Sequence, residues 1–534
     1  MRTLSQSPDV PHGTQNMKSE IRESSLEMSA GEGFGKHSDN DDLNQFGYEA
    51  QLERRFGLWS MVGLSCTIMV TWEAWFTTFN IAVIDGGRTG AFWGYVFVWV
   101  GYTCVIGSLS ELVSMTPTAA GQYHWAYELA PPKYRKFISW FTGWQIVLAW
   151  QADFAAVLYL SGILIQAVAA LNWPGYSPQP YQATLILWVV ILASVLFNTT
   201  LAKHLRWIEG SILICHCLGF IVVLVPIVYF GPHVPAKDVW AQFVSSGGYS
   251  NGSAFFVGLV ATVFPFLGAD GAIHMAEEVK DARVNVPWAL MISVTINGVL
   301  GIGMVIAILF TLGTLEDIEQ ITSASVSGSS LVDYFWFVLD DRGFATGLTS
   351  LLIAMFIFAA VAVLASTSRV TWAFARDNGL PGSTWIKKVH PGTHLPLWSI
   401  AFSAVISLFL SLINIGSSVA FNAIVSLTVA CFFGSYGIPI ALLAWRRATN
   451  RPLKLGPWNW GRYGLAINIV SVCWLIITWV FAFFPIAIPV TPATMNWSCV
   501  LWGGSMILGL GWYFIRQHKV FTGPRVQAGT MNLH

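Results

Sequence analysis

Long apolar runs separated by short polar segments repeat along most of the chain. Each run has about 20 residues or more, the length that a helix needs to cross a hydrocarbon core of about 30 Å. We predict twelve membrane-spanning helices, at about 58–82, 91–115, 138–170, 181–201, 207–230, 253–276, 288–312, 344–368, 396–414, 418–445, 463–484 and 497–515. An even number of spans places both ends of the chain on the same side of the membrane.

Two of these runs contain groups that a lipid-spanning helix rarely tolerates. Glu73 lies near the middle of the first run, and Gly268, Asp270 and Gly271 lie near the middle of the sixth. Glycine permits backbone conformations that other residues avoid. A pair of interrupted spans at matching positions of two halves indicates the substrate site of a secondary transporter.

The two interrupted runs each begin a block of five predicted helices. Because five is odd, the second block enters the membrane from the opposite side, which gives an inverted repeat followed by two extra helices. The fold class is therefore an all-α polytopic membrane protein. We predict five parts: a disordered cytoplasmic tail at 1–50, repeats at 51–230 and 253–445, helices 11 and 12 within 446–515, and a cytoplasmic tail at 516–534.

Composition and charge agree with a membrane protein. Of 534 residues, 54% are hydrophobic and 10% charged, against about 25% charged in soluble domains. Equal numbers of basic and acidic residues, 28 of each, offer no net field for nucleic acid. With both termini cytoplasmic, 25 of the basic residues fall inside and only Arg88, Lys237 and Arg342 fall outside, as the positive-inside rule requires.

Two acidic residues in predicted spans are candidates for coupling transport to an ion. An ionisable group near the centre of a spanning helix costs at least about 2.5 kcal/mol on insertion scales, so it normally faces a cavity. Glu73 could bind an ammonium group or carry a proton, or it could be a protonated residue bonded within the bundle. Asp153 has no lysine or arginine in mid-span to neutralise it. Its partner could be a proton, a cationic substrate or Glu73, with one proton shared between the two acids.

The residues at the two interruptions form the candidate substrate site. Where the sixth helix breaks, the freed N–H groups of its second half would face a substrate carboxylate and the freed carbonyls an ammonium group. Asp270 could instead cap the second half of that helix, and we slightly favour the cap. The substrate-binding candidates are Thr71, Trp72, Glu73, Ala74, Phe266, Gly268, Asp270 and Gly271.

Other polar residues lie near the inner ends of the spans. Glu111, Glu277 and Glu278 could form a cytoplasmic gate with Lys280, Arg283 or Arg369, although solvated charges at span ends would look the same. His216 and His274 sit alone on apolar segments, and helix packing is the expected role for isolated histidines. We expect no metal site, no catalytic residue and no cofactor, because the spans carry no HExxH, GxSxG or paired carboxylate motif.

Three segments resemble the signatures of the fungal amino acid/choline transporter family, within the amino acid-polyamine-organocation superfamily. They are SELVSMTPTAAGQYHWAYELAPP at 110–132, FLGADGAIHMAEEVKDARVNVP at 266–287, and ASTSRVTWAFARDNGLP at 365–381 followed by KVHPGTHLP at 388–396. The similarity extends in order over about residues 45–520.

This resemblance implies the 5 + 5 inverted repeat of the leucine-transporter type, with the first and sixth helices unwound in mid-membrane. It also implies uptake of amino acids, γ-aminobutyrate, choline or related amines at the plasma membrane, normally driven by protons. Ser366, Thr367 and Ser368 occupy the neighbourhood where sodium-coupled relatives bind an ion, so sodium remains a less favoured alternative. An exchanger or exporter, or a nutrient sensor without transport, also remains open, and the sequence does not identify the solute.

Overall fold

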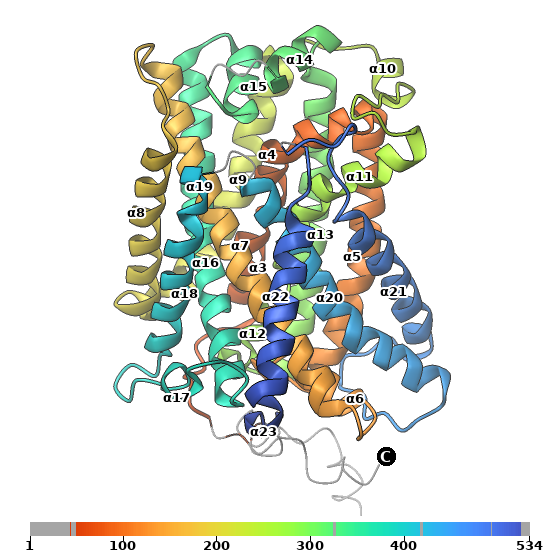
Figure 1. The fold of residues 1–534 in the computed structure, drawn as a ribbon. Helices are drawn as coiled ribbons and strands as arrows, with labels where there is room; N and C mark the ends of the chain where they lie inside the picture. Colours follow the sequence, from red (N-terminus) through yellow and green to blue (C-terminus); the bar gives the residue numbers. More distant parts are fainter. Residues whose placement is uncertain are drawn as a thin grey trace, which may run out of the picture.

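The computed structural model describes residues 43, 48, 50–323, 327–416, 420–492 and 494–524. Within them the chain forms a bundle of helices without a named strand, which confirms the all-α prediction for this part of the chain. We call the end of the bundle that bears α10, α14 and α15 the upper end, and the end that bears α6, α17 and α23 the lower end (Figure 1). The predicted tail at 1–50 and the last ten residues lie almost wholly outside the described residues.

Ten helical segments of the described chain are long and apolar enough to cross a membrane. They are built from α5 (Gly87–Met115), α7 (Arg135–Asn172), α8 (Pro180–Thr199), α9 (Leu205–Phe230), α13 (Ala282–Thr311), α16 (Arg342–Arg376), α18 (Leu397–Ser411) with α19 (Ile413–Gly416), α20 (Ala420–Ala448), α21 (Gly464–Phe481), and α22 (Ser498–Trp512) with the turns that follow it as far as α23 (His518–Val520).

The two remaining predicted spans, the first and the sixth, are broken helices. The first is α3 (Leu58–Met69) and α4 (Thr71–Ile84). The sixth begins as α11 (Asn251–Val263) and η2 (Phe264–Phe266) and continues only as the short turns α12 (Gly271–His274) and η3 (Ala276–Glu278). The second half of the sixth span is therefore not a continuous helix in the described structure.

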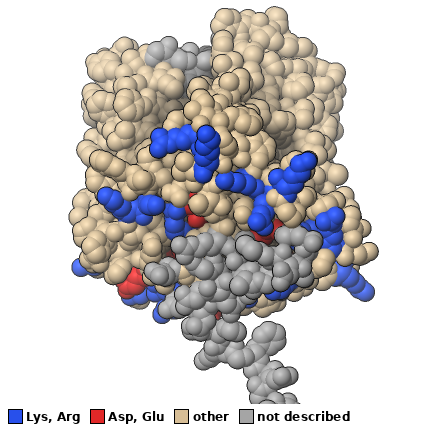
Figure 2. All heavy atoms as spheres, turned by 60° about the horizontal axis from the view of Figure 1, so that its bottom comes forward, with Lys and Arg blue, Asp and Glu red and all other residues tan. Residues whose placement is uncertain are grey.

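Shorter helices connect the long ones. At the lower end lie α6 (Gln122–Leu129) and α17 (Ser383–Ile386), and at the upper end lie α10 (Ala236–Trp240), α14 (Leu315–Ser323) and α15 (Ser330–Leu339) (Figure 1). Lysine and arginine side chains gather at the lower end (Figure 2). Lys237, one of the three basic residues predicted for the other side, lies in α10 at the upper end.

Helices from the two predicted repeats pack against each other in matching pairs. The second helices of the blocks, α5 and α13, are in extensive contact, and so are the third helices, α7 and α16. The lower half of the first helix, α3, packs against α9 and α13. The two broken helices are thus enclosed by long helices on several sides.

Asp85 at the upper end is a buried carboxylate just after α4. It is 1% exposed, and neither carboxylate oxygen has a hydrogen-bond partner among the described residues. Burial raises the pKa of Asp85 to about 7, whereas an aspartate in an unfolded chain titrates near 3.9.

This shift makes stability depend on pH. Between about pH 4 and 7 the folded protein binds more protons than the unfolded chain, so stability falls as pH rises and levels off above about 7. We expect Asp85→Asn to flatten that decline, measured as melting temperature of the purified protein from pH 5 to pH 8. Glu316→Gln, at an exposed position of α14, serves as the control. The same slope in wild type and Asp85→Asn would contradict the prediction.

Candidate substrate site at two broken helices

The first helix is interrupted at Val70. Its backbone is left-handed, with φ 37° and ψ 45°, a conformation that is costly for a β-branched residue. The break frees the N–H of Thr71, which donates to Asn297 Oδ1 of α13 at 3.3 Å. Strain of this kind persists where the surrounding structure holds it, often at functional sites.

The sixth helix is interrupted between Phe266 and Gly271. Gly268 has a positive φ of 83°, which favours glycine. A Cβ atom at Gly268 or at Gly271 would collide with the side chain of Ile68 in α3. Ser65 Oγ also donates to Ala269 O at 3.4 Å. The two interruptions are therefore in direct contact, and their close approach depends on glycine.

Asp153 of α7 lies beside this junction. Its Oδ2 is 3.7 Å from the position that a Cβ of Gly268 would occupy, and the residue is 4% exposed. Within the described part of the chain, Asp153 has no hydrogen bond or ion pair. Asp270 is the charged group near it. The sequence thus identified a carboxylate that the fold brings to the sixth-helix break.

Asp270 does not cap α12, so the favoured cap prediction was wrong. Its backbone is helical, and its side chain turns instead to other elements. Gln122 Nε2 of α6 donates to Asp270 Oδ2 at 2.9 Å, and His274 Nε2 lies 3.4 Å from the same oxygen. The other nitrogen of His274 is 3.0 Å from Ala119 O. Asp270 Oδ1 has no partner among the described residues.

Aromatic side chains surround these carboxylates. Trp150 precedes Asp153 by three positions on α7, and its ring lies against Gly271. Tyr102 of α5 and Tyr436 of α20 lie close to Asp270. The rings of Tyr102 and Phe266 are 6.0 Å apart. The indole N–H of Trp150 and both tyrosine hydroxyls lack hydrogen-bond partners in the described structure, so they are available to a bound solute.

Glu73 and Trp72, both substrate-binding candidates, face α9. Glu73 Oε1 lies 2.7 Å from His216 Nδ1, and both side chains are buried. The ring of Trp72 packs against His216 and against Phe220, with centroids 6.0 and 6.1 Å apart. Glu73 is therefore partnered by a histidine that could exchange a proton with it. Thr71 and Ala74 are buried beside them.

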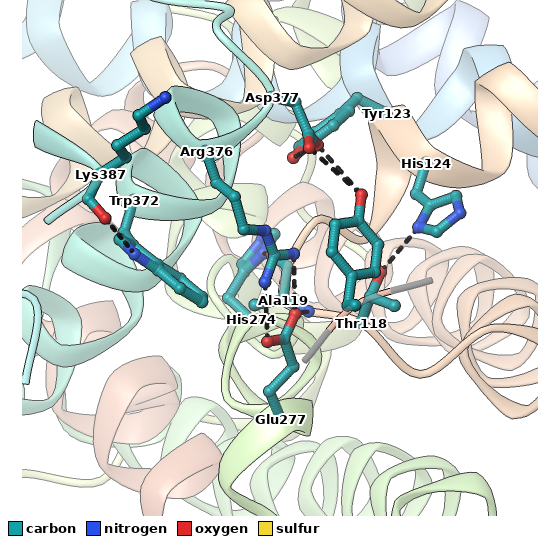
Figure 3. Close-up of polar contacts among 11 residues, drawn as sticks. Thr118, Ala119, Tyr123, His124, His274, Glu277, Trp372, Arg376, Asp377 and Lys387 are labelled. Carbon is teal, nitrogen blue, oxygen red and sulfur yellow. Dashed lines mark hydrogen bonds and ion pairs between the residues drawn. The ribbon is translucent and has the colours of Figure 1, made fainter. Parts of the chain in front are cut away.

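The inner-end acids form ion pairs at the lower end of the bundle. Glu278 Oε1 lies 2.7 Å from Arg369 Nε, and Arg369 is one of the partners predicted from the sequence. Glu277 pairs with Arg376 instead, through two contacts of 2.9 Å, and it accepts from Ala119 N at 3.0 Å. Figure 3 shows Arg376 pointing from the end of α16 to Glu277.

The same cluster includes Tyr48, in the segment before α3. The Arg376 guanidinium lies over the rings of Tyr48 and Trp372, 4.0 and 4.5 Å from their centroids. Asp377, which lies beside Tyr123 in Figure 3, accepts from the Tyr123 hydroxyl. It also accepts from the hydroxyl of Tyr48. Burial raises the pKa of Asp377 to about 6, against the opposing effects of Arg376 and these hydroxyls.

Backbone hydrogen bonds tie the first helix to this cluster. The N–H groups of Arg55 and Phe56 donate to Glu278 O at 2.9 and 3.1 Å, and Lys280 N donates to Phe56 O at 3.0 Å. We call Tyr48, Glu277, Glu278, Arg369, Arg376 and Asp377 the lower-end lock. Its contacts join the start of the first helix, the end of the sixth and the end of α16.

Glu111 is not part of this lock. Its Oε1 pairs with Arg447 of α20, and Trp460 N donates to the same oxygen at 3.3 Å. Arg447 also donates to Asn468 of α21 at 2.5 Å. Glu111 therefore joins α5 to α20 and α21, and the predicted partners Lys280, Arg283 and Arg369 were wrong for this residue.

The hydroxyls of α16 bond to backbone carbonyls. Ser366 Oγ donates to Gly271 O at 3.2 Å, and Thr367 Oγ1 donates to Val363 O at 2.7 Å and lies 3.2 Å from Trp150 O. Ser368 Oγ donates to Ala365 O at 2.9 Å. These contacts place α16 against the sixth-helix break.

Sequence reasoning missed several residues of the site. Gln122, Asn297, Tyr102 and Tyr436 come from helices that neither interruption marks. Buried polar residues in otherwise apolar spans were the available signal, but polar and aromatic residues are too common in this chain for that signal to select them. Ile68, the contact between the breaks, carries no polar signal at all.

The chain is similar in sequence to known permeases and transporters of fungi and plants. A family model described as amino acid permease matches residues 56–505. The chain is 30% identical over 463 residues to the choline transporter of Saccharomyces cerevisiae, covering 85% of this chain and 80% of that protein. It is 28% identical over 498 residues to an amino-acid permease of Arabidopsis thaliana, covering 90% and 95%. It is 29% identical over 441 residues to a putative amino acid/polyamine transporter of Macrophomina phaseolina, covering 82% and 96%.

Proposed function

Because the chain belongs to the amino acid permease family, we propose that it imports a small amine-bearing solute by alternating access, driven by protons. The family makes it a membrane transporter of amino acid-like solutes rather than an enzyme. Beyond the family assignment, we propose that the solute bears an amine group, that protons drive its transport, and that the direction is import.

The contact between the two helix breaks carries this proposal. Ile68 of the first helix meets Gly268 and Gly271 of the sixth, and the carboxylate of Asp153 lies at the same point without a protein partner in the described chain. Unwound backbone in a membrane is tolerated where it lines a cavity or is buried in protein. Broken helices of this kind form the substrate sites of secondary transporters.

The arrangement of the long helices supports twelve spans in an inverted 5 + 5 repeat followed by two helices. The matching contacts of α5 with α13 and of α7 with α16 are those expected of two related blocks. The basic lower end supports cytoplasmic termini, and uptake implies the plasma membrane (Figure 2).

The two ends of the bundle differ in a way that suits alternating access. The lower-end lock closes the lower end, while a cavity of about 420 Å³ opens toward the upper end. Tyr159 on the wall of that cavity is six residues along α7 from Asp153, or about 9 Å at the rise of an α-helix.

Uptake assays in transporter-deficient cells test the proposal. We expect one labelled amine to accumulate and to be displaced in a competition panel of choline, γ-aminobutyrate, neutral and basic amino acids and polyamines. Dissipating the proton gradient should stop accumulation, and replacing sodium should not. If accumulation follows external sodium instead, sodium rather than the proton is the coupling ion. If the cells transport no solute at all, the proposal is wrong. Counterflow from preloaded vesicles separates import from exchange or export.

A further inference from the structure

We propose that the site selects organic cations over zwitterions, with Asp153 receiving the ammonium group of the solute. This inference rests on the proposed transport function and names the charge class of its substrate. It begins from a charge imbalance at the sixth-helix break.

Two carboxylates meet at the break, and they are not equally compensated. Asp270 has a donor in Gln122 and a titratable neighbour in His274. Asp153 has neither, and no lysine or arginine of the described chain pairs with either aspartate. The arginines of the ion pairs, Arg369, Arg376 and Arg447, are held by glutamates. Burying an ionised carboxylate without a partner is costly, so an ionised Asp153 needs a positive charge beside it, which the ammonium group of a bound solute would supply.

The rings near Asp153 suit an ammonium group. Trp150 lies on the same face of α7, three positions before Asp153, where side chains of a helix are neighbours. Phe266, Tyr102 and Tyr436 line the adjoining side of the break. Cations are attracted to the faces of such rings, and desolvation strengthens the attraction. A carboxylate among aromatic rings therefore favours an organic cation over a small hydrated ion.

A substrate carboxylate would be opposed at the same place. A zwitterion would bring its anionic group close to Asp153 and Asp270, and like charges in a poorly solvated site repel strongly. The side-chain donors without a partner in the described structure here are the hydroxyls of Tyr102 and Tyr436 and the indole N–H of Trp150. These neutral donors can bond to a polar group of the solute but cannot neutralise an additional anion.

Matched solute pairs test the inference on the purified full-length protein in lipid nanodiscs without a proton gradient. The pairs are choline with glycine betaine, putrescine with γ-aminobutyrate, and arginine with citrulline. The cation carries one net positive charge more than its partner in the first and third pairs, and two more in the second. For the pair that binds, we expect the cation to bind at least about tenfold more tightly in the wild type. Equal or tighter binding of the zwitterion overturns the inference while leaving transport intact.

Variants of Asp153 assign the preference to that residue. We expect Asp153→Asn to weaken cation binding at least about tenfold and to change zwitterion binding little, because a buried charge pair has lost one partner. Asp153→Glu, which keeps the charge, should retain part of the preference, and the control Glu316→Gln should retain all of it. Unchanged cation affinity in Asp153→Asn would overturn the inference even if accumulation is lost, because Asp153 would then carry the proton.

The failure of this inference differs from failure of the proposed function. If no solute of the three pairs binds while cells accumulate a neutral solute, the charge preference is wrong and transport stands. If cells accumulate nothing, the proposed function fails. Should Asp153→Asn not fold, the wild-type comparison of matched pairs still decides the charge class.

Discussion

Replacing Glu73 by glutamine is expected to abolish accumulation of the solute against its gradient while exchange across the membrane continues. Glu73 is fully buried in α4, and its Oε1 lies 2.7 Å from His216 Nδ1. Glu73 Oε2 and His216 Nε2 have no hydrogen-bond partners among the described residues. A carboxylate and an imidazole in contact can hold one proton between them and release it when the site opens to the other side.

Glutamine preserves the size of the side chain and can still bond to His216, so the fold should survive. It cannot take up or release a proton. One proton moving down one pH unit provides about 1.4 kcal/mol, enough for about tenfold accumulation of a solute. We therefore expect the ratio of internal to external solute to fall from about tenfold to one. Counterflow should persist, because it needs binding and exchange but no driving proton.

The measurement compares accumulation and counterflow at equal surface expression. His216→Gln tests the partner and should reduce accumulation in the same way. Glu316→Gln, at an exposed position of α14, is the control that should leave both readouts unchanged. Full accumulation in Glu73→Gln would remove Glu73 from the coupling mechanism.

The apolar pattern predicted most of the fold because the bilayer imposes it. A spanning helix must satisfy its own backbone hydrogen bonds, so each span has to be long, apolar and continuous. The places where the sequence breaks that rule, at Glu73 and at Gly268, lie within three residues of the points where the two helices are interrupted. The exact break in the first helix, at Val70, was not predictable, since valine disfavours the left-handed conformation that it adopts there.

Partners within the site were harder to predict than its location. The bonds of Glu277 to Arg376, Gln122 to Asp270 and His216 to Glu73 join residues 99, 148 and 143 positions apart. Such pairs depend on how the helices rotate and pack, which periodicity along one helix does not specify. The cap prediction for Asp270 failed for the same reason: a local motif was outweighed by a donor from another helix.

Replacing Arg376 by glutamine is expected to open the lower end of the bundle. Arg376 holds Glu277 with two contacts of 2.9 Å and lies between the rings of Tyr48 and Trp372. Its loss leaves Glu277, which is 2% exposed, as a buried carboxylate without its cation. Removing one partner of a buried ion pair costs about 3–5 kcal/mol. That cost falls on the closed arrangement, because an opened lower end lets water reach Glu277.

Hydrogen exchange measures this opening directly. The amides of Arg55, Phe56 and Lys280 bond across the lower end, so they should exchange at least about tenfold faster in Arg376→Gln, given that 1.4 kcal/mol corresponds to tenfold. Arg376→Lys keeps the charge but not the bidentate geometry and should fall between wild type and Arg376→Gln. Arg206→Gln, at an exposed position in the first turn of α9, is the matched control. If accumulation is lost while these amides exchange at the wild-type rate, Arg376 acts elsewhere in the transport cycle. Disrupting the lower-end lock should expose the backbone hydrogen bonds of these amides to water and so speed their exchange.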